Sequence, residues 1–76
     1  MATKNLAEDP YEKLANAIVL KAVSDYRAAL RLAKKNPSAE QDVKNLERFF
    51  RSEWYSVLTG VDPEYLMERL REETNM

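Results

Sequence analysis

The residues best suited to chemistry form one predicted helix face in the middle of the chain. Lys44, Arg48, Arg51 and Tyr55 follow one another at intervals of four, three and four residues, which places them on one side of an α-helix. Three cations beside an aromatic ring suit an anionic ligand with a planar part, or an acidic protein surface. The alternative is an ordinary solvated face, because Glu47 precedes Arg51 by four residues and can form an ion pair with it.

A second group of cations lies toward the end of the preceding predicted helix. If the two helices form a hairpin around Asn36-Pro37, the two basic faces come together as the largest positive patch on the molecule. The alternative is a charged surface that serves solubility. The members of this second group are Arg27, Arg31, Lys34 and Lys35.

The chain lacks the residue types on which most enzymes and metal sites depend. It has no His and no Cys, which removes the usual general base near neutral pH, disulfides, and thiolate or imidazole metal ligands. Ser52 has no His to activate it, and the chain has no glycine-rich phosphate loop. Glu64, Glu68 and Glu72 stack at intervals of four, which predicts a solvated acidic face. We therefore expect no enzymatic activity, no metal and no cofactor.

Three prolines divide the chain into predicted helices. Asp9-Pro10 and Asp62-Pro63 are helix-start signatures, because the Asp side chain caps free amides and Pro occupies the first helical position. Helices should therefore begin near Pro10 and Pro63, and Pro37 should separate the first helix from the second.

The middle helix has its own start and stop signals. Ser38 and Gln41 have the spacing of a capping box, and Thr59-Gly60 predicts the helix end, with Gly60 in the left-handed conformation. Ser52 offers an alternative, because its side chain could cap a new turn directly after it and divide the helix in two.

These signals predict an all-α fold in one domain of 76 residues. A long helical hairpin, about 10–36 and 39–59, is capped by a short third helix, about 63–73. Residues 1–8 and 73–76 are expected to fray. The expected core follows the apolar faces and consists of Leu14, Ile18, Ala22, Tyr26, Leu30, Leu46, Phe50, Trp54, Leu58, Leu66 and Leu70.

The apolar face of the first helix covers about half of its circumference, which is wider than one partner helix needs. It suits a central helix with two intramolecular neighbours, or a helix that also contacts another chain. Leu20 lies outside this face and should be exposed. A core this small with a face this wide predicts a homo-oligomer.

Charge is unevenly distributed along the chain. Residues 1–36 carry seven Lys or Arg against four Asp or Glu, a net +3, whereas residues 37–76 carry five against nine, a net −4. The total of −1 differs from the strongly basic character of most nucleic-acid binders. No apolar run approaches the roughly 18 residues of a membrane span, and the N-terminus lacks the apolar stretch of a signal peptide. A cytoplasmic protein with no membrane partner is expected.

Three segments carry a likeness to other proteins: DYRAAL (25–30), ERFFRSEWYSVLT (47–59) and VDPEYLMERLREE (61–73). Through them the chain resembles short uncharacterised helical proteins of phages and integrative elements of Gram-positive bacteria. The resemblance implies a protein of a mobile element in the host bacterial cytoplasm. Such elements carry small non-enzymatic proteins that bind host factors, including defence systems, or their nucleotide messengers.

Two functions from different classes remain open. The first is a protein-binding module that binds and modulates or inhibits a bacterial host protein, which includes anti-defence activity. The second is a binder of nucleotides or nucleic acid through the basic and aromatic helix face. The slightly negative net charge favours the first.

Overall fold

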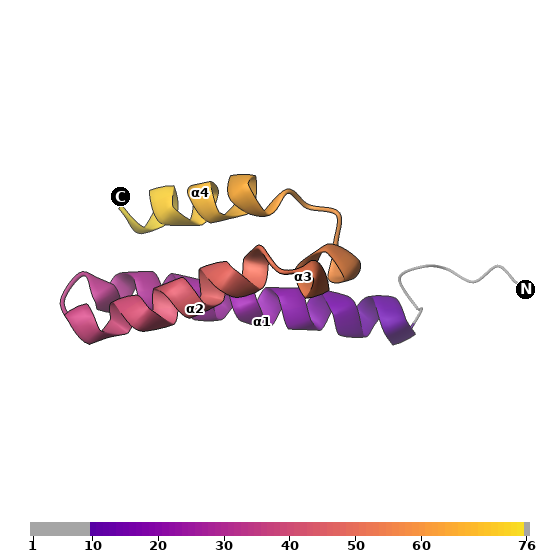
Figure 1. The fold of residues 1–76 in the computed structure, drawn as a ribbon, viewed down its shortest axis with the longest axis horizontal. Helices are drawn as coiled ribbons and strands as arrows, with labels where there is room; N and C mark the ends of the chain where they lie inside the picture. Colours follow the sequence, from indigo (N-terminus) through magenta and orange to yellow (C-terminus); the bar gives the residue numbers. More distant parts are fainter. Residues whose placement is uncertain (1–9, 76) are drawn as a thin grey trace, which may run out of the picture.

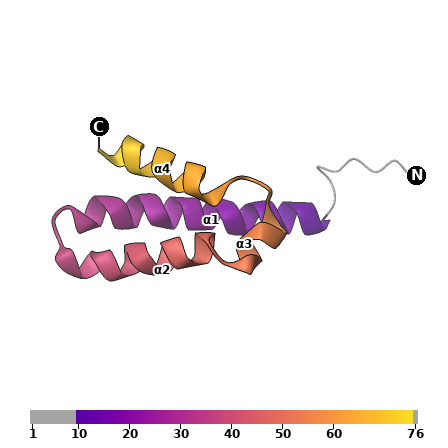
Figure 2. The same cartoon turned by 45° about the horizontal axis from the view of Figure 1, so that its top comes forward.

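The computed structural model describes residues 10–75, which form helices joined by short turns. α1 and α2 form an antiparallel hairpin, and α4 packs on another side of α1 (Figures 1 and 2). The predicted all-α hairpin with a short final helix is confirmed. The elements are α1 (Pro10–Ala33), the 3-10 turn η2 (Pro37–Ala39), α2 (Glu40–Phe50), α3 (Glu53–Leu58) and α4 (Pro63–Thr74).

α1 is the central helix, because it contacts α2, α3 and α4. Ala15, Ala22 and Ala29 recur every seven residues on its buried side. Their small side chains allow neighbouring helices to approach closely. The wide apolar face predicted for this helix therefore has several intramolecular partners.

α1 ends at Ala33, three residues before the predicted end at 36. Asn36 is extended, with φ −130° and ψ 104°, because a residue before proline disfavours the helical region. Its side chain accepts a hydrogen bond of 3.1 Å from the backbone amide of Ser38. The predicted capping box of Ser38 is therefore wrong, since its hydroxyl donates to Asn36 Oδ1 at 2.7 Å and does not cap α2.

The predicted middle helix is divided at Ser52, which is the alternative that its side chain suggests. Ser52 is extended, with φ −83° and ψ 165°. Its hydroxyl donates to the carbonyl of Phe49 at 2.7 Å and accepts from the amide of Tyr55 at 3.4 Å. One side chain therefore closes α2 and caps α3.

α3 ends where Thr59-Gly60 predicts, but by a different geometry. Thr59 is extended, with φ −156°, and its amide bonds to the carbonyl of Tyr55 at 3.0 Å. The chain leaves the helix in the β region, so Gly60 does not take the predicted left-handed conformation.

The core lies where α2, α3 and α4 meet the middle of α1. Tyr26, Phe50, Tyr55 and Met67 are fully buried there. Four edge-to-face contacts join the rings of Tyr26, Phe49, Phe50 and Tyr55, with centroids 5.4–6.2 Å apart. Each such pair contributes about 0.5–1.5 kcal/mol beyond the area it buries.

Most of the predicted core is found inside. Leu14, Ile18 and Trp54 are exceptions, since they are 59%, 40% and 72% exposed. Trp54 is exposed because the break at Ser52 changes the helical phase. Leu14 and Ile18 are exposed because they lie on a side of α1 that the other described helices leave open. The other predicted core residues are buried or half-buried: Ala22, Tyr26, Leu30, Leu46, Phe50, Leu58, Leu66 and Leu70.

α4 keeps its helical hydrogen bonds to the C-terminal end of the described chain. The amide of Asn75 bonds to the carbonyl of Arg71 at 3.1 Å, so residues 73–75 close the last turn of α4 where fraying is predicted. The fraying predicted for 1–8, and residue 76, lie outside the described residues. Leu20 is exposed, as predicted. Among residues 10–75 no helix combines the length and the apolar character that crossing a bilayer requires.

Candidate functional site

The break between α2 and α3 takes apart the predicted basic face. Arg51 is the C-cap of α2, while Tyr55 lies on α3 and is 1% exposed. Burial, and then the charge of Asp62, raises the pKa of Tyr55. Its ring cannot stack on a ligand from solvent, so the predicted role of Tyr55 is wrong. Lys44 and Arg48 remain exposed on α2, and neither forms an ion pair with another described residue.

Two arginines of the predicted patch bind carboxylates of α4. Arg51 donates from Nε and Nη2 to the two carboxylate oxygens of Glu64, at 2.7 and 3.3 Å. This pair raises the pKa of Arg51 and lowers that of Glu64. Arg27 Nε donates to Glu73 Oε1 at 3.0 Å. The two glutamates lie near opposite ends of α4, so each end of this helix has an ion pair with a cation from another part of the chain. α4 runs alongside α1 (Figure 2).

The other cations of the second predicted group lie at the end of α1 and in the turn after it. Lys34 Nζ donates to the carbonyl of Thr74 at the end of α4. Arg31 and Lys35 are exposed, and within the described chain they form no ion pair. Cations from both predicted basic faces therefore turn toward α4, and its carboxylates neutralise part of the positive charge.

A polar cluster that the sequence pattern does not predict joins three helices. Tyr26 Oη on α1 donates to Glu47 Oε2 on α2 at 2.7 Å. Arg71 Nη1 on α4 donates to Tyr26 Oη at 3.2 Å and to Glu47 Oε2 at 3.3 Å. Burial, and then the hydrogen bond to Glu47, raises the pKa of Tyr26 to about 12. The predicted pair of Glu47 with Arg51 is longer, 3.9 Å, so the cluster is the main partner of this carboxylate.

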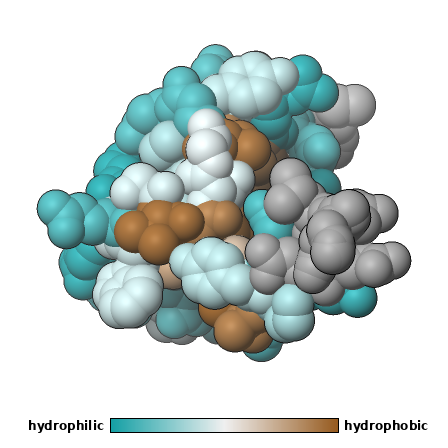
Figure 3. Space-filling view, turned by 90° about the vertical axis from the view of Figure 1, so that its right-hand side faces the viewer, coloured by the Kyte–Doolittle hydropathy of each residue, from teal (hydrophilic) through white to brown (hydrophobic). Residues whose placement is uncertain are grey.

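The strongest candidate for a binding surface is the outer side of α3. Trp54 and Val57 are 72% and 61% exposed. Figure 3 shows the end of the molecule where α3 and the start of α1 lie, and apolar side chains reach the surface there. A hollow of about 330 Å³ lies at this surface, and Glu53, Trp54 and Val57 are the described residues that line it. An exposed cluster of this kind is typical of a protein contact.

The sequence contains the signal for this surface, although its helical pattern places Trp54 in the core. A regular helix would bury Phe50 and Trp54 together, four residues apart. The extended residue Ser52 interrupts that spacing, so Tyr55 enters the core beside Phe50, at 5.6 Å between ring centroids. The neighbouring Trp54 then faces outward.

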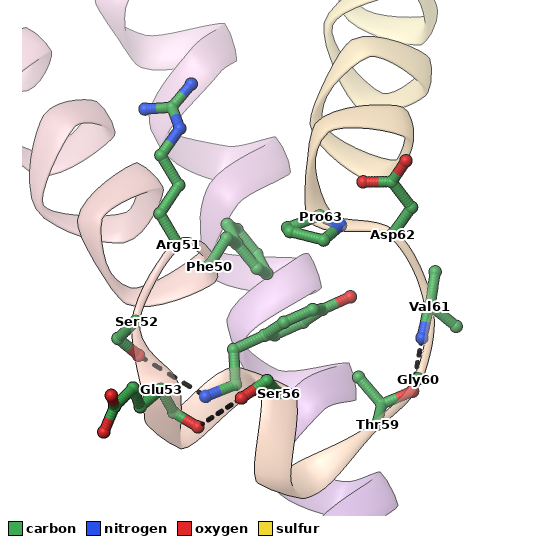
Figure 4. A pocket seen from close by; sticks show the side chains of 11 residues that line it. Phe50, Arg51, Ser52, Glu53, Ser56, Thr59, Gly60, Val61, Asp62 and Pro63 are labelled. Carbon is green, nitrogen blue, oxygen red and sulfur yellow. Dashed lines mark hydrogen bonds between the residues drawn. The ribbon is translucent and has the colours of Figure 1, made fainter.

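A second hollow, of about 360 Å³, lies between α3 and the loop before α4 (Figure 4). Two hydrogen bonds shape the loop: Val61 N–H donates to Thr59 Oγ1 at 3.3 Å, and Glu64 N–H donates to Asp62 Oδ1 at 3.0 Å. Tyr55 lines this hollow, and its buried hydroxyl has no hydrogen-bond partner among the described residues. The described residues therefore leave this buried donor unsatisfied.

Neither a metal site nor a similar protein indicates what these surfaces do. Within residues 10–75, no group of three or more Asp, Glu, His or Cys side chains could hold a metal ion. Comparison of the chain with protein-family models, curated proteins and solved structures finds no match. The function is therefore argued from the surfaces described above.

Proposed function

We propose that the chain is a non-enzymatic module of a phage or mobile element that binds and modulates a bacterial host protein, with α3 as its contact surface. The observation that carries this proposal is the exposure of Trp54, the single tryptophan of the chain, on a folded helix. Tryptophan is among the residues that most often dominate binding energy, and truncating such a residue typically costs about 2 kcal/mol or more of binding free energy.

α3 presents Trp54 in an ordered position. The adjacent Tyr55 is buried against Phe50, and the Ser52 side chain caps the helix. A partner that covers Trp54 therefore pays little conformational entropy to order the helix beneath it. This favours specific binding to a folded protein surface over non-specific hydrophobic association.

Charge near α3 indicates the chemistry of the partner. Glu53 is exposed and lines the same hollow as Trp54 and Val57. A matching partner surface has an apolar cleft for the indole ring and a basic side chain at its edge. The charge pair would contribute mainly to the association rate, and the indole ring to the affinity.

The single tryptophan provides a direct test. A host protein captured from lysate is purified and titrated into the chain while the fluorescence of Trp54 is followed. We expect a shift of emission to shorter wavelength on binding. Trp54→Ala should weaken binding about 30-fold or more, measured by calorimetry. Glu53→Lys should mainly slow association and reduce its dependence on salt.

Tyr65→Ala is the matched control, because Tyr65 is an exposed aromatic residue on α4 and lies outside the α3 surface. It should leave the affinity unchanged. Full binding by Trp54→Ala, or loss of binding by Tyr65→Ala alone, would contradict the role of α3.

Binding of nucleotides or nucleic acid is the second candidate function. It is supported by Lys44 and Arg48, which lie four residues apart, are exposed and form no ion pair with a described residue. It ranks lower because the predicted ring is buried and Arg51 is paired with Glu64. Labelled oligonucleotides and cyclic dinucleotides at low salt test it directly. Binding that Arg48→Glu abolishes and Trp54→Ala leaves intact would favour this function over the first.

A further inference from the structure

A second exposed surface runs along α1, on a side that the other described helices leave open. Six residues follow one another there at intervals of four, three, four, three and four, the spacing of a helix seam that packs against another helix. All six are exposed, and the three largest apolar members are 59%, 40% and 52% exposed in chain order. This α1 stripe consists of Leu14, Ile18, Lys21, Asp25, Ala28 and Leu32.

The α1 stripe is complementary to itself when it is reversed. Its members lie in pairs at equal distances on either side of Val23. With a second copy of α1 antiparallel, and a two-fold axis on the stripe side at the height of Val23, Lys21 of each copy faces Asp25 of the other. The same operation places the large side chain of Ile18 opposite the small one of Ala28.

The outermost pair fits the same arrangement. Leu14 of one copy faces Leu32 of the other, and Leu32 borders a hollow of about 390 Å³ between α1 and α2. Leu46 of α2 also lines this hollow. The second copy's Leu14 would therefore meet apolar side chains from both helices of the hairpin.

The charges at the centre select the antiparallel direction. A parallel pair would place Lys21 against Lys21 and Asp25 against Asp25, which is unfavourable for like charges in contact. Within one chain, Lys21 Nζ and Asp25 Oδ2 are 3.2 Å apart and exposed. The Lys-first order is the weaker orientation for such a pair on a helix, so little is lost when each group also binds a second copy.

We infer that the protein forms a homodimer in which the α1 stripes of two copies pack antiparallel. The partner on this surface is a second copy of the chain. When the stripe of that copy runs in the opposite direction, each cation faces an anion and the large Ile18 faces the small Ala28. The inference is independent of the proposed function, since the dimer interface lies on α1 and the proposed contact surface lies on α3.

Charge exchange tests the interface. Asp25→Lys gives a stripe with two cations, and Lys21→Asp gives a stripe with two anions. Each variant alone should show a dimer dissociation constant raised about tenfold or more, measured by sedimentation equilibrium. An equimolar mixture should recover the dimer as a heterodimer. Circular dichroism checks that both charge variants remain folded. Leu20→Ala is the control, because Leu20 is exposed on α1 outside the stripe.

Cross-linking tests the direction of packing, and the absence of Cys makes each engineered thiol the only one in its chain. Ile18→Cys and Ala28→Cys chains should cross-link through a short bismaleimide when mixed, and each should fail to do so alone. Cross-linking of each variant alone, with none in the mixture, would indicate parallel packing and overturn the inference. A wild-type chain that stays monomeric at all concentrations would also overturn it, as would single charge variants that dimerise like the wild type.

Discussion

The core and the outer side of α3 use aromatic residues in opposite ways. Where α2 and α4 cover α1, Tyr26 and Phe50 are buried and the polar hydroxyl of Tyr26 is fully paired. On its outer side, α3 leaves Trp54 and Val57 at the surface. Phe50 and Trp54 lie four residues apart in one stretch of sequence, so residue type does not explain the difference. Its cause is the break at Ser52, which separates a stretch that stabilises the fold from one available for binding.

The largest expected effect is the loss of the central ring. Phe50→Ala removes a fully buried side chain that contacts three other aromatic rings, and should lower the free energy of unfolding by about 3–5 kcal/mol. A chain of this length has a total of only about 4–11 kcal/mol, so the variant should be largely unfolded at moderate temperature.

Trp54→Ala is the matched comparison, because truncating an exposed ring on the outer side of α3 should change the free energy of unfolding by less than about 0.5 kcal/mol. Urea unfolding followed by circular dichroism measures both variants. Equal losses would mean that Trp54 also belongs to the core, and the contrast between the core and the outer side of α3 would disappear.

An intermediate effect is expected from the polar cluster at high pH. The pKa of Tyr26 is raised to about 12 in the folded chain, so between pH 10 and 12 the unfolded chain releases a proton that the folded chain keeps. Stability should therefore be unaffected below pH 10 and fall as the pH rises toward 12. Thermal unfolding across this range measures the slope.

Tyr26→Phe should make this slope smaller, because it removes the titrating hydroxyl. Burial raises the pKa of Tyr55 in the same direction, so the double variant with Tyr55→Phe should show a still smaller slope. An unchanged slope in both variants would show that neither hydroxyl is responsible.

The smallest expected effect concerns two arginines at the C-terminal end of α2, one inside the helix and one at its C-cap. Arg51→Glu replaces an ion pair with Glu64 by two like charges, and should lower the melting temperature slightly at low salt. Arg48→Glu should leave it unchanged, since Arg48 has no ion-pair partner among the described residues. Added salt should remove the difference, because both side chains are exposed. A difference that persists at high salt would point to a packing change instead.

Local signals in the sequence were sufficient for most of the fold. The start of α4 at Pro63 depends on one or two adjacent residues and is confirmed. α1 is helical from Pro10, the first residue that the structure describes. The all-α hairpin follows from these boundaries and from the apolar faces. The same local chemistry explains the division at Ser52, which was an alternative because a serine in this position can either continue or interrupt a helix.

The candidate site was less predictable because it depends on distant contacts. The predicted basic face required one continuous helix through Arg51 and Tyr55. Residues 51 and 52 are not helical, so Tyr55 points in a different direction from the one predicted. The pairing of Arg27 with Glu73 joins residues 46 positions apart, and no helical periodicity indicates it. The cluster of Tyr26, Glu47 and Arg71 likewise needs three helices in place.

Trp54 and Tyr55 are consecutive residues that face opposite directions, one toward solvent and one into the core. Substitutions at Trp54 and Val57 can therefore alter the outer surface while the side chains that hold the helices together stay the same. The outer surface of α3 can therefore change over generations without loss of the fold.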